Sequence, residues 1–152
     1  MRMAQALAKD RKAAMALLAG AQASRLDALL AGSGLPDTAE FLRGPETGLV
    51  TVRGRIGGGG APFNVGEATV TRATVKLPGG EIGHSYALGR DREKARLAAI
   101  IDALWQSASH RDDVERAILA PLRSEAEAAE QKREEETAAT RVEFFTMVRG
   151  ED

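Results

Sequence analysis

The chain has 152 residues, 43% of them hydrophobic, which is enough for one modest core and short for two. We therefore expect a single domain over residues 1–152. Its 21 basic and 22 acidic side chains give a formal net charge of -1, which argues against general attraction to nucleic acid or to an anionic membrane. With no cysteine and only two histidines, disulfides, thiolate nucleophiles and iron–sulfur ligation are excluded, and an ordinary zinc site lacks imidazoles.

The first thirty residues favour two helices. Residues 2–18 are rich in strong helix formers, and Gly20 is expected to end the first helix before a second at residues 21–30, so that the two form an αα-hairpin. The small and apolar run at 13–21 is too short to cross a bilayer. It could imitate a signal peptide, but Asp10 interrupts the basic start and the amphipathic pattern continues beyond it, so we expect a cytoplasmic protein.

The middle of the chain is typical of a small antiparallel meander. Residues 39–43 suit a short strand or a helical turn, of which we favour the strand, and residues 44–47 have the composition of a chain reversal. Alternation then predicts strands at 49–56, 68–77 and 81–88. In the first of these, one apolar face is expected to point toward the helices (Val50, Val52, Ile56). In the last, four residues share a face (Ile82, His84, Tyr86, Leu88).

After residue 90 the pattern becomes helical. Asp91 is well placed as the N-cap of a helix whose apolar residues recur at i, i+3, i+4 and i+7, and Trp105 at the edge of this stripe is expected to pack rather than to bind a ligand. Asp112 could cap a short helix at 114–120, and Pro121 either kinks the chain or starts a new helix. Residues 124–140 form a helix that is polar all round, typical of a solvated or partner-facing element.

Residues 141–150 are apolar and favour a strand, docked in this sheet or in that of a neighbour. The predicted fold class is therefore α+β. A small antiparallel sheet packs against helices, with an N-terminal αα-hairpin, a long polar C-terminal helix and a C-terminal strand.

The stretch from Gly54 to Arg72 holds four consecutive glycines, which suggests a backbone that must turn or approach something closely. A P-loop needs a Lys-Ser/Thr pair after its last glycine, and Ala61-Pro62-Phe63 follows here instead. The dinucleotide pattern G-x-G-x-x-G fails as well. A nest of backbone N–H groups beside Arg55 or Arg72 could still hold phosphate oxygens, although a structural loop or a subunit contact is the favoured interpretation.

The remaining polar residues do not form a complete catalytic set. His84 and Ser85 are neighbours on a strand, so their side chains leave opposite faces, and His110 has no serine tied to it. His84 is interpreted as a core or edge residue. Glu67 could act as a general base, but local spacing places no second carboxylate near it.

Several short segments of the sequence together resemble the PhnG family. They are Gly48-Leu49-Val50, Gly54-Arg55-Ile56-Gly57-Gly58, Ala61-Pro62-Phe63-Asn64, Gly66-Glu67-Ala68-Thr69-Val70-Thr71-Arg72, Gly89-Arg90-Asp91 and Arg141-Val142-Glu143-Phe144-Phe145-Thr146-Met147-Val148-Arg149-Gly150. The resemblance runs from the first helix to the C-terminus. Gly59 stands where the family commonly has threonine and His84 where other members can have tyrosine, which argues against an essential hydroxyl or imidazole at those places.

This resemblance implies a subunit of the bacterial carbon–phosphorus lyase system, in a core complex with PhnH, PhnI and PhnJ. Together with PhnH, PhnI and PhnL, the family is credited with transferring the ribose triphosphate of ATP to an alkylphosphonate with release of adenine. Nucleosidase-type chemistry is attributed to PhnI. S-adenosylmethionine and an iron–sulfur cluster are expected on PhnJ, so this chain is predicted to bind no cofactor or metal, with ATP a substrate of the complex. No nucleic acid or membrane partner is expected, and the isolated chain could self-associate.

No catalytic residue carries over from the family, so the candidate sites are physical hypotheses. The candidates for phosphate or partner binding are Arg55, Gly57, Gly58, Gly59, Gly60, Asn64, Glu67, Arg72 and Arg90. The candidates for a subunit interface are Phe63, Arg141, Phe144, Phe145, Met147 and Arg149. Either the arginines help to build the transfer site, or the chain is a scaffold that does not touch substrate. We favour the scaffold role within this process.

Overall fold

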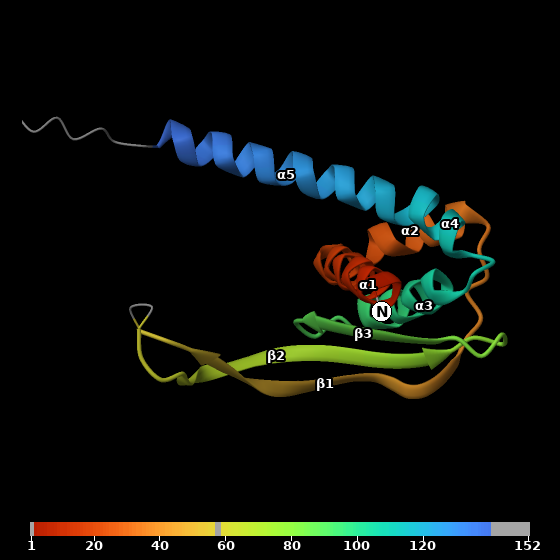
Figure 1. Cartoon of the computed structure of the whole chain (residues 1–152), viewed down its shortest axis with the longest axis horizontal. Coiled ribbons are helices and arrows are strands. Elements are labelled where there is room, and N and C mark those ends of the chain that lie inside the picture. Colours follow the sequence, from red (N-terminus) through yellow and green to blue (C-terminus); the bar gives the residue numbers. More distant parts are fainter. Residues whose placement is uncertain (1, 57–58, 141–152) are drawn as a thin grey trace, which may run out of the picture.

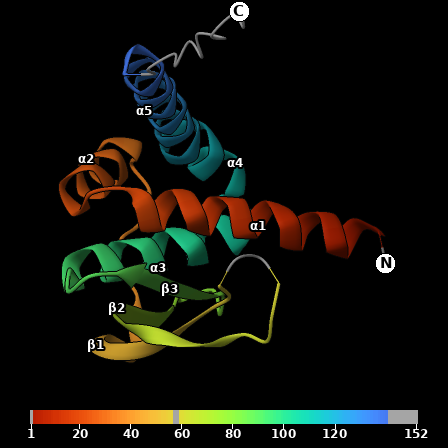
Figure 2. The ribbon, with the colours of Figure 1, turned by 90° about the vertical axis from the view of Figure 1, so that its left-hand side faces the viewer.

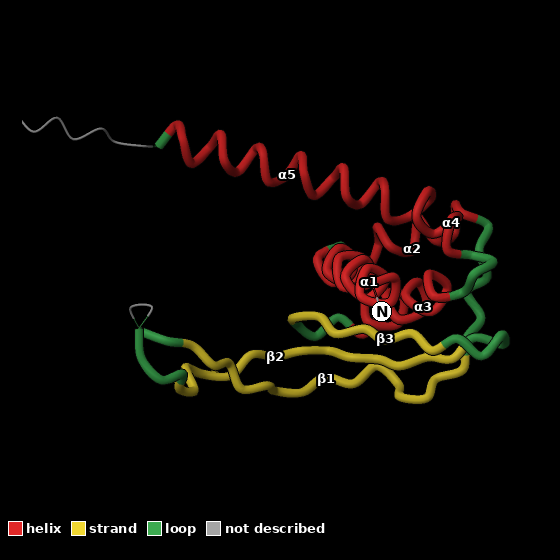
Figure 3. Tube along the Cα trace, viewed as in Figure 1, coloured by secondary structure: helices red, strands yellow, loops and turns green. Residues whose placement is uncertain are grey.

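The computed structural model describes residues 2–56 and 59–140 and has the predicted α+β architecture: one antiparallel sheet with its helices gathered on one face (Figures 1 and 3). The sheet has the order β1-β2-β3 and is formed by β1 (Glu40–Gly54), β2 (Phe63–Lys76) and β3 (Ile82–Leu88). The helical elements are α1 (Arg2–Gly20), α2 (Ala23–Ser33), α3 (Arg92–Gln106), α4 (Arg111–Val114), a π-helical turn η1 (Glu115–Leu119) and α5 (Ala120–Ala139).

The core lies between α3 and the sheet, with α1 and α2 packed on α3 (Figure 2). Thr71, Ala73 and Val75 of β2 are buried, as is Leu77 directly after the strand, and this follows the predicted alternation. Asp91 caps α3, because its carboxylate accepts a hydrogen bond of 2.8 Å from the Lys94 N–H. Both N-terminal helices are confirmed, and both pack on α3, α1 also on β3 and α2 also on η1.

Trp105 belongs to this core, as predicted. Its side chain is 4% exposed, and its indole N–H donates to the Glu115 carboxylate at 2.7 Å. The guanidinium of Arg111 lies over the ring, 4.8 Å from its centroid. Trp105 therefore joins α3 to the helical segment that follows it.

Gly83 sets the distance between α3 and β3. A Cβ at this position would lie 2.0 Å from the Ala99 carbonyl oxygen and 2.5 Å from the Ala103 nitrogen. The residues of α3 that face β3 here are alanines, and the residue of β3 opposite them is a glycine. The helix backbone therefore rests directly on the sheet.

A buried carboxylate joins three elements at the same place. Asp102 of α3 is 2% exposed and accepts both Nε (3.0 Å) and Nη2 (2.7 Å) of Arg11 on α1. It also accepts the backbone N–H of His84 on β3 at 2.8 Å. The hydrogen bond from Arg11 is the largest of the influences that raise the pKa of its guanidinium above the ordinary value.

The predicted reversal at residues 44–47 is wrong. β1 runs unbroken from Glu40 to Gly54, which confirms the strand favoured at residues 39–43, and the register with β2 shifts between Phe41 and Arg43 and again between Arg43 and Glu46. The Gly44-Pro45 pair is thus absorbed as a bulge in an edge strand, where a missing N–H is tolerated.

The predicted orientation of β1 is also wrong. Thr47 pairs with the buried Thr71, so Thr47, Leu49 and Thr51 lie on the face of the sheet that carries the helices. Val50 and Val52 pair with Ala68 and Gly66 and therefore lie on the opposite face, while Ile56 lies beyond the strand and is 81% exposed. Alternation identified the two faces of the strand correctly but could not say which one the helices cover.

The last helices differ from prediction at their start. His110, not Asp112, occupies the N-cap position, since the Val114 N–H already bonds to the His110 carbonyl at 3.0 Å. The π-helical turn η1 ends at Leu119, directly before α5, whose second residue is Pro121. Because Pro121 has no N–H, a regular α-helix would lack one hydrogen bond at this place. Beyond Leu122 every residue of α5 is exposed, as predicted, and Figure 1 shows the helix leaving the body. The C-terminal strand predicted at 141–150 lies outside the described residues.

Candidate functional site

The glycine loop is at the tip of a long β1–β2 hairpin. Gly54 and Phe63 form the last pair of the ladder, and both strands run well past β3 and the helices α1, α2 and α3 before they meet (Figure 1). Gly60 has φ +143°, a conformation that side chains rarely adopt, while Gly57 and Gly58 lie outside the described residues. Arg55 is exposed at this tip, and Phe63 is partly exposed beside it.

Arg72 does not lie near this loop. It is nine positions along β2 from Phe63, roughly 30 Å for an extended strand. There its Nε donates to the Glu46 carboxylate of β1 at 2.6 Å, and Arg43 lies 3.3 Å from the same carboxylate. Asn64 and Glu67 are exposed on β2 between the two arginines. The structure therefore separates Arg55 from Arg72, and one phosphate group could not contact both.

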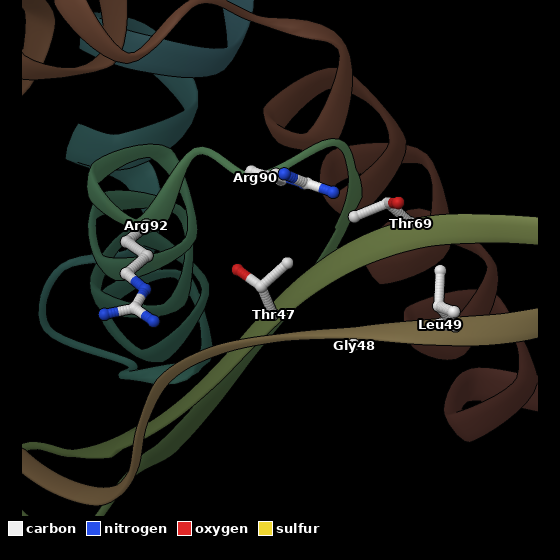
Figure 4. A pocket seen from close by; sticks show the side chains of 6 residues that line it. All are labelled: Thr47, Gly48, Leu49, Thr69, Arg90 and Arg92. Atoms are coloured by element: carbon white, nitrogen blue, oxygen red, sulfur yellow. The ribbon is translucent and has the colours of Figure 1, made fainter.

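Arg90 lies in a different place, at an open hollow between the sheet and the start of α3. The hollow has a volume of about 510 Å³, and six residues line it: Thr47, Gly48, Leu49, Thr69, Arg90 and Arg92. We call it the arginine hollow. Figure 4 shows Arg92 at the left, Arg90 above Thr47, and Thr69 beyond the guanidinium end of Arg90.

The charge of the arginine hollow is not neutralised by its neighbours. The two acids nearest in sequence are already engaged: Asp91 caps α3, and Glu93 accepts Arg96 at 2.6 Å. That bond is the main reason why the pKa of Glu93 lies below its ordinary value. Among the described residues, no carboxylate lies within ion-pair distance of Arg90 or Arg92.

The two threonines of the hollow have different roles. The Thr71 hydroxyl donates to the Gly89 carbonyl at 2.7 Å, so the 3.0 Å contact between Thr47 and Thr71 must use the Thr47 proton. Thr47 is thereby fixed as part of the frame. The hydroxyl of Thr69 makes no hydrogen bond within the described part of the chain and remains available as a donor.

Sequence reasoning included Arg90 but missed Arg92, Thr47 and Thr69. The sequence could have indicated Arg92. In Arg90-Asp91-Arg92-Glu93 two acids alternate with two arginines, and once Asp91 is assigned as the N-cap of α3, only Glu93 is left to pair with an arginine. The threonines could not be found this way, since they join the hollow only through the register of β1 with β2.

His84 and Ser85 lie on opposite faces of β3, as predicted. His84 is exposed on the edge strand β3 and contacts the Thr74 hydroxyl through Nδ1 at 3.1 Å. Ser85 points to the buried face, where its hydroxyl accepts the Ala73 N–H at 3.1 Å.

In the part of the chain that the structure describes, no three His, Cys, Asp or Glu side chains gather to hold a metal ion.

Comparison with known proteins identifies the family. The model of the family described as "Phosphonate metabolism protein PhnG" matches residues 9–150. The chain belongs to the PhnG family. A relative from Rhizobium meliloti (strain 1021), named alpha-D-ribose 1-methylphosphonate 5-triphosphate synthase subunit PhnG, is 57% identical over 145 residues, which cover 94% of this chain and 91% of that protein.

The family match confirms the resemblance drawn from the motifs at 48–91 and includes the whole of the closing segment at 141–150. As for membranes, each helix among the described residues is too short or too polar to cross one.

Proposed function

We propose that this chain is a PhnG subunit of an alpha-D-ribose 1-methylphosphonate 5-triphosphate synthase, acting in the breakdown of organic phosphonates. The observation that carries the proposal is the 57% identity, along almost the full length of both proteins, to a subunit of that name. Identity at this level over this length supports the same place in the same assembly.

The reaction assigned to the complex exchanges one bond at the ribose. A phosphonate oxygen attacks C1′ of ATP, the C1′–N9 bond breaks, and adenine leaves with the proton that the phosphonate or solvent supplies. The product keeps the triphosphate at C5′. We propose PhnH, PhnI and PhnJ as the partner subunits, with PhnL acting in the same step and the S-adenosylmethionine and iron–sulfur chemistry residing on PhnJ.

The form of this chain supports a dependent subunit rather than a solitary enzyme. Its β1–β2 hairpin carries apolar side chains into solvent beyond the helical layer, with Ile56 81%, Val65 60% and Phe63 43% exposed. An apolar surface on a projecting element is typical of one that is covered in an assembly. The second projecting element, α5, is polar all round beyond Leu122.

Omission of this subunit tests the proposal. We expect the partner subunits, supplied with ATP and methylphosphonate, to release adenine at the full rate only when this chain is present, as measured by chromatography of the free base. Reactions without methylphosphonate give the background. Full adenine release in the absence of this chain would contradict the proposal.

A second experiment separates a substrate-binding subunit from a pure scaffold. Arg55 is exposed at the hairpin tip and has no ion pair among the described residues, so Arg55→Ala should leave the fold intact. If an intact complex with this variant releases adenine at the unchanged rate, the glycine loop does not contribute to phosphate binding. If turnover falls while assembly persists, the scaffold interpretation fails for the loop.

A further inference from the structure

The arginine hollow has the features of a site for a multiply charged anion. It places two guanidinium groups on one surface depression, and both lie outside every ion pair found among the described residues. Most other arginines of the described part are neutralised by a carboxylate, such as Arg11 by Asp102 and Arg25 by Glu125. The positive charge left at the hollow is therefore concentrated on Arg90 and Arg92.

The frame of the hollow is rigid, which favours binding over adaptation. Thr47 is held by Thr71, Thr71 by the Gly89 carbonyl, and the Gly89 N–H by the Thr69 carbonyl at 2.9 Å. This chain of bonds fixes the turn from β3 to α3, which carries Arg90. The Asp91 cap in turn fixes the first turn of α3, which carries Arg92. Little ordering of the backbone is then required when a ligand arrives.

The donors suit phosphate oxygens. Each guanidinium presents a planar fork that can bond two oxygens, the free Thr69 hydroxyl adds a neutral donor, and the positive end of α3 lies at the same edge. A volume of about 510 Å³ exceeds the need of a single phosphate and suits a chain of phosphates.

We propose that the arginine hollow binds the polyphosphate chain of a nucleotide-like ligand, with Arg90 and Arg92 on successive phosphates and Thr69 on a bridging or terminal oxygen. The identity of the ligand as the triphosphate of ATP or of the ribosyl product rests on the proposed function. The binding of a polyphosphate chain is independent of that function and rests on the hollow alone. The glycine loop, which is at the other end of the hairpin, is not part of this site.

The proposal is tested by titrating the full chain with tripolyphosphate in a calorimeter. Charged hydrogen bonds of this kind predict that Arg90→Ala and Arg92→Ala each weaken binding roughly tenfold. Arg92→Lys should be intermediate, since it keeps the charge and loses the fork. Arg116→Ala, which removes an exposed arginine on η1, is the matched control and should bind like the parent chain.

Competition identifies which part of the ligand is recognised. ATP should displace tripolyphosphate, and adenosine should not. The proposal is overturned if the parent chain does not bind tripolyphosphate, if the double variant Arg90→Ala/Arg92→Ala binds it equally well, if Arg55→Ala alone removes binding, or if adenosine competes as well as ATP.

The same double variant separates this inference from the proposed function. In a complex that still assembles, we expect its KM for ATP in adenine release to rise at least tenfold. Loss of polyphosphate binding by the isolated variant with an unchanged KM would show that the hollow is not used in that reaction. A complex that never releases adenine even with the parent chain would contradict the proposed function and leave the binding result standing.

Discussion

Asp102 is the residue on which the packing of α1, α3 and β3 depends. Its carboxylate is 2% exposed and accepts two bonds from Arg11 and one from the His84 N–H, while Gln106 approaches Oδ2 at 3.3 Å. Gln106 also donates to the Ile82 carbonyl at 2.5 Å. Side chains of α3 thus satisfy both a donor and an acceptor on the outer edge of β3, where unpaired backbone groups would otherwise invite another strand.

Replacing Asp102 by alanine should therefore be costly. The change leaves the His84 N–H without its acceptor and a half-buried guanidinium without its counter-ion, so we expect a loss of roughly 3–5 kcal/mol in the free energy of unfolding, measured by urea denaturation. Arg25→Ala removes the exposed ion pair with Glu125 and should cost far less, because water and salt screen that pair. Equal losses for the two variants would contradict the role given to burial.

Glu93 offers a prediction about pH. Its hydrogen bond from Arg96 holds the pKa of the carboxyl below the ordinary value of 4.5. A depressed pKa in the folded state means that the pair stabilises the fold fully above pH 4.5 and ceases to do so as the pH falls through the folded pKa. In Arg96→Gln, the pKa of Glu93 should rise toward its ordinary value, as followed by carbon NMR of the side-chain carboxyl.

Arg116→Gln is the control for that titration. Arg116 pairs with Asp113 on the adjacent helical turns, so its loss should leave the pKa of Glu93 unchanged. A rise of the Glu93 pKa in both variants would point to the general charge of the protein rather than to the Arg96 bond.

At the level of elements, the contact between α3 and β3 depends on Gly83. In Gly83→Ala, the new Cβ would collide with backbone atoms of Ala99 and Ala103, which cannot rotate away. The helix must shift, at a cost of about 1–3 kcal/mol or more in the free energy of unfolding. Gly66→Ala on β2 is the control, because nothing lies within 4 Å of its new Cβ. A thermal midpoint that falls by the same amount in both would sink the argument.

Sequence patterns predicted most of these elements, and most of the wrong details share one cause. The presence of the helices, the β2 alternation and the Asp91 cap depend on residues close in sequence and were predicted correctly, although the cap expected at Asp112 is equally local and was wrong. The bulge at Gly44-Pro45, the side of β1 that faces the helices, and the closeness of Gly83 to α3 depend on pairing with distant residues. The same reason hid Thr47 and Thr69 of the arginine hollow, while Arg90 was accessible to a local reading.

At the scale of the whole molecule, two elements project from a small body: the β1–β2 hairpin and α5 (Figure 1). They differ in chemistry. The hairpin is apolar at its end, with Ile56 and Val65 largely exposed, whereas α5 beyond Leu122 presents charged and small side chains to solvent. Burying the hairpin end would remove apolar surface from water at a gain of about 25 cal/mol per Å². A solvated polar helix offers no such gain.

The hairpin is therefore expected to hold this subunit in its complex. Ile56→Glu and Val65→Glu replace exposed side chains, so the isolated chain should keep its thermal midpoint, while association with the partner subunits should weaken at least tenfold, as measured by co-purification and light scattering. Ala128→Glu at an exposed position of α5 is the control and should leave association unchanged. If the two hairpin variants assemble normally and Ala128→Glu does not, the roles of the projecting elements are reversed, because the polar helix rather than the apolar hairpin would then form the decisive contact.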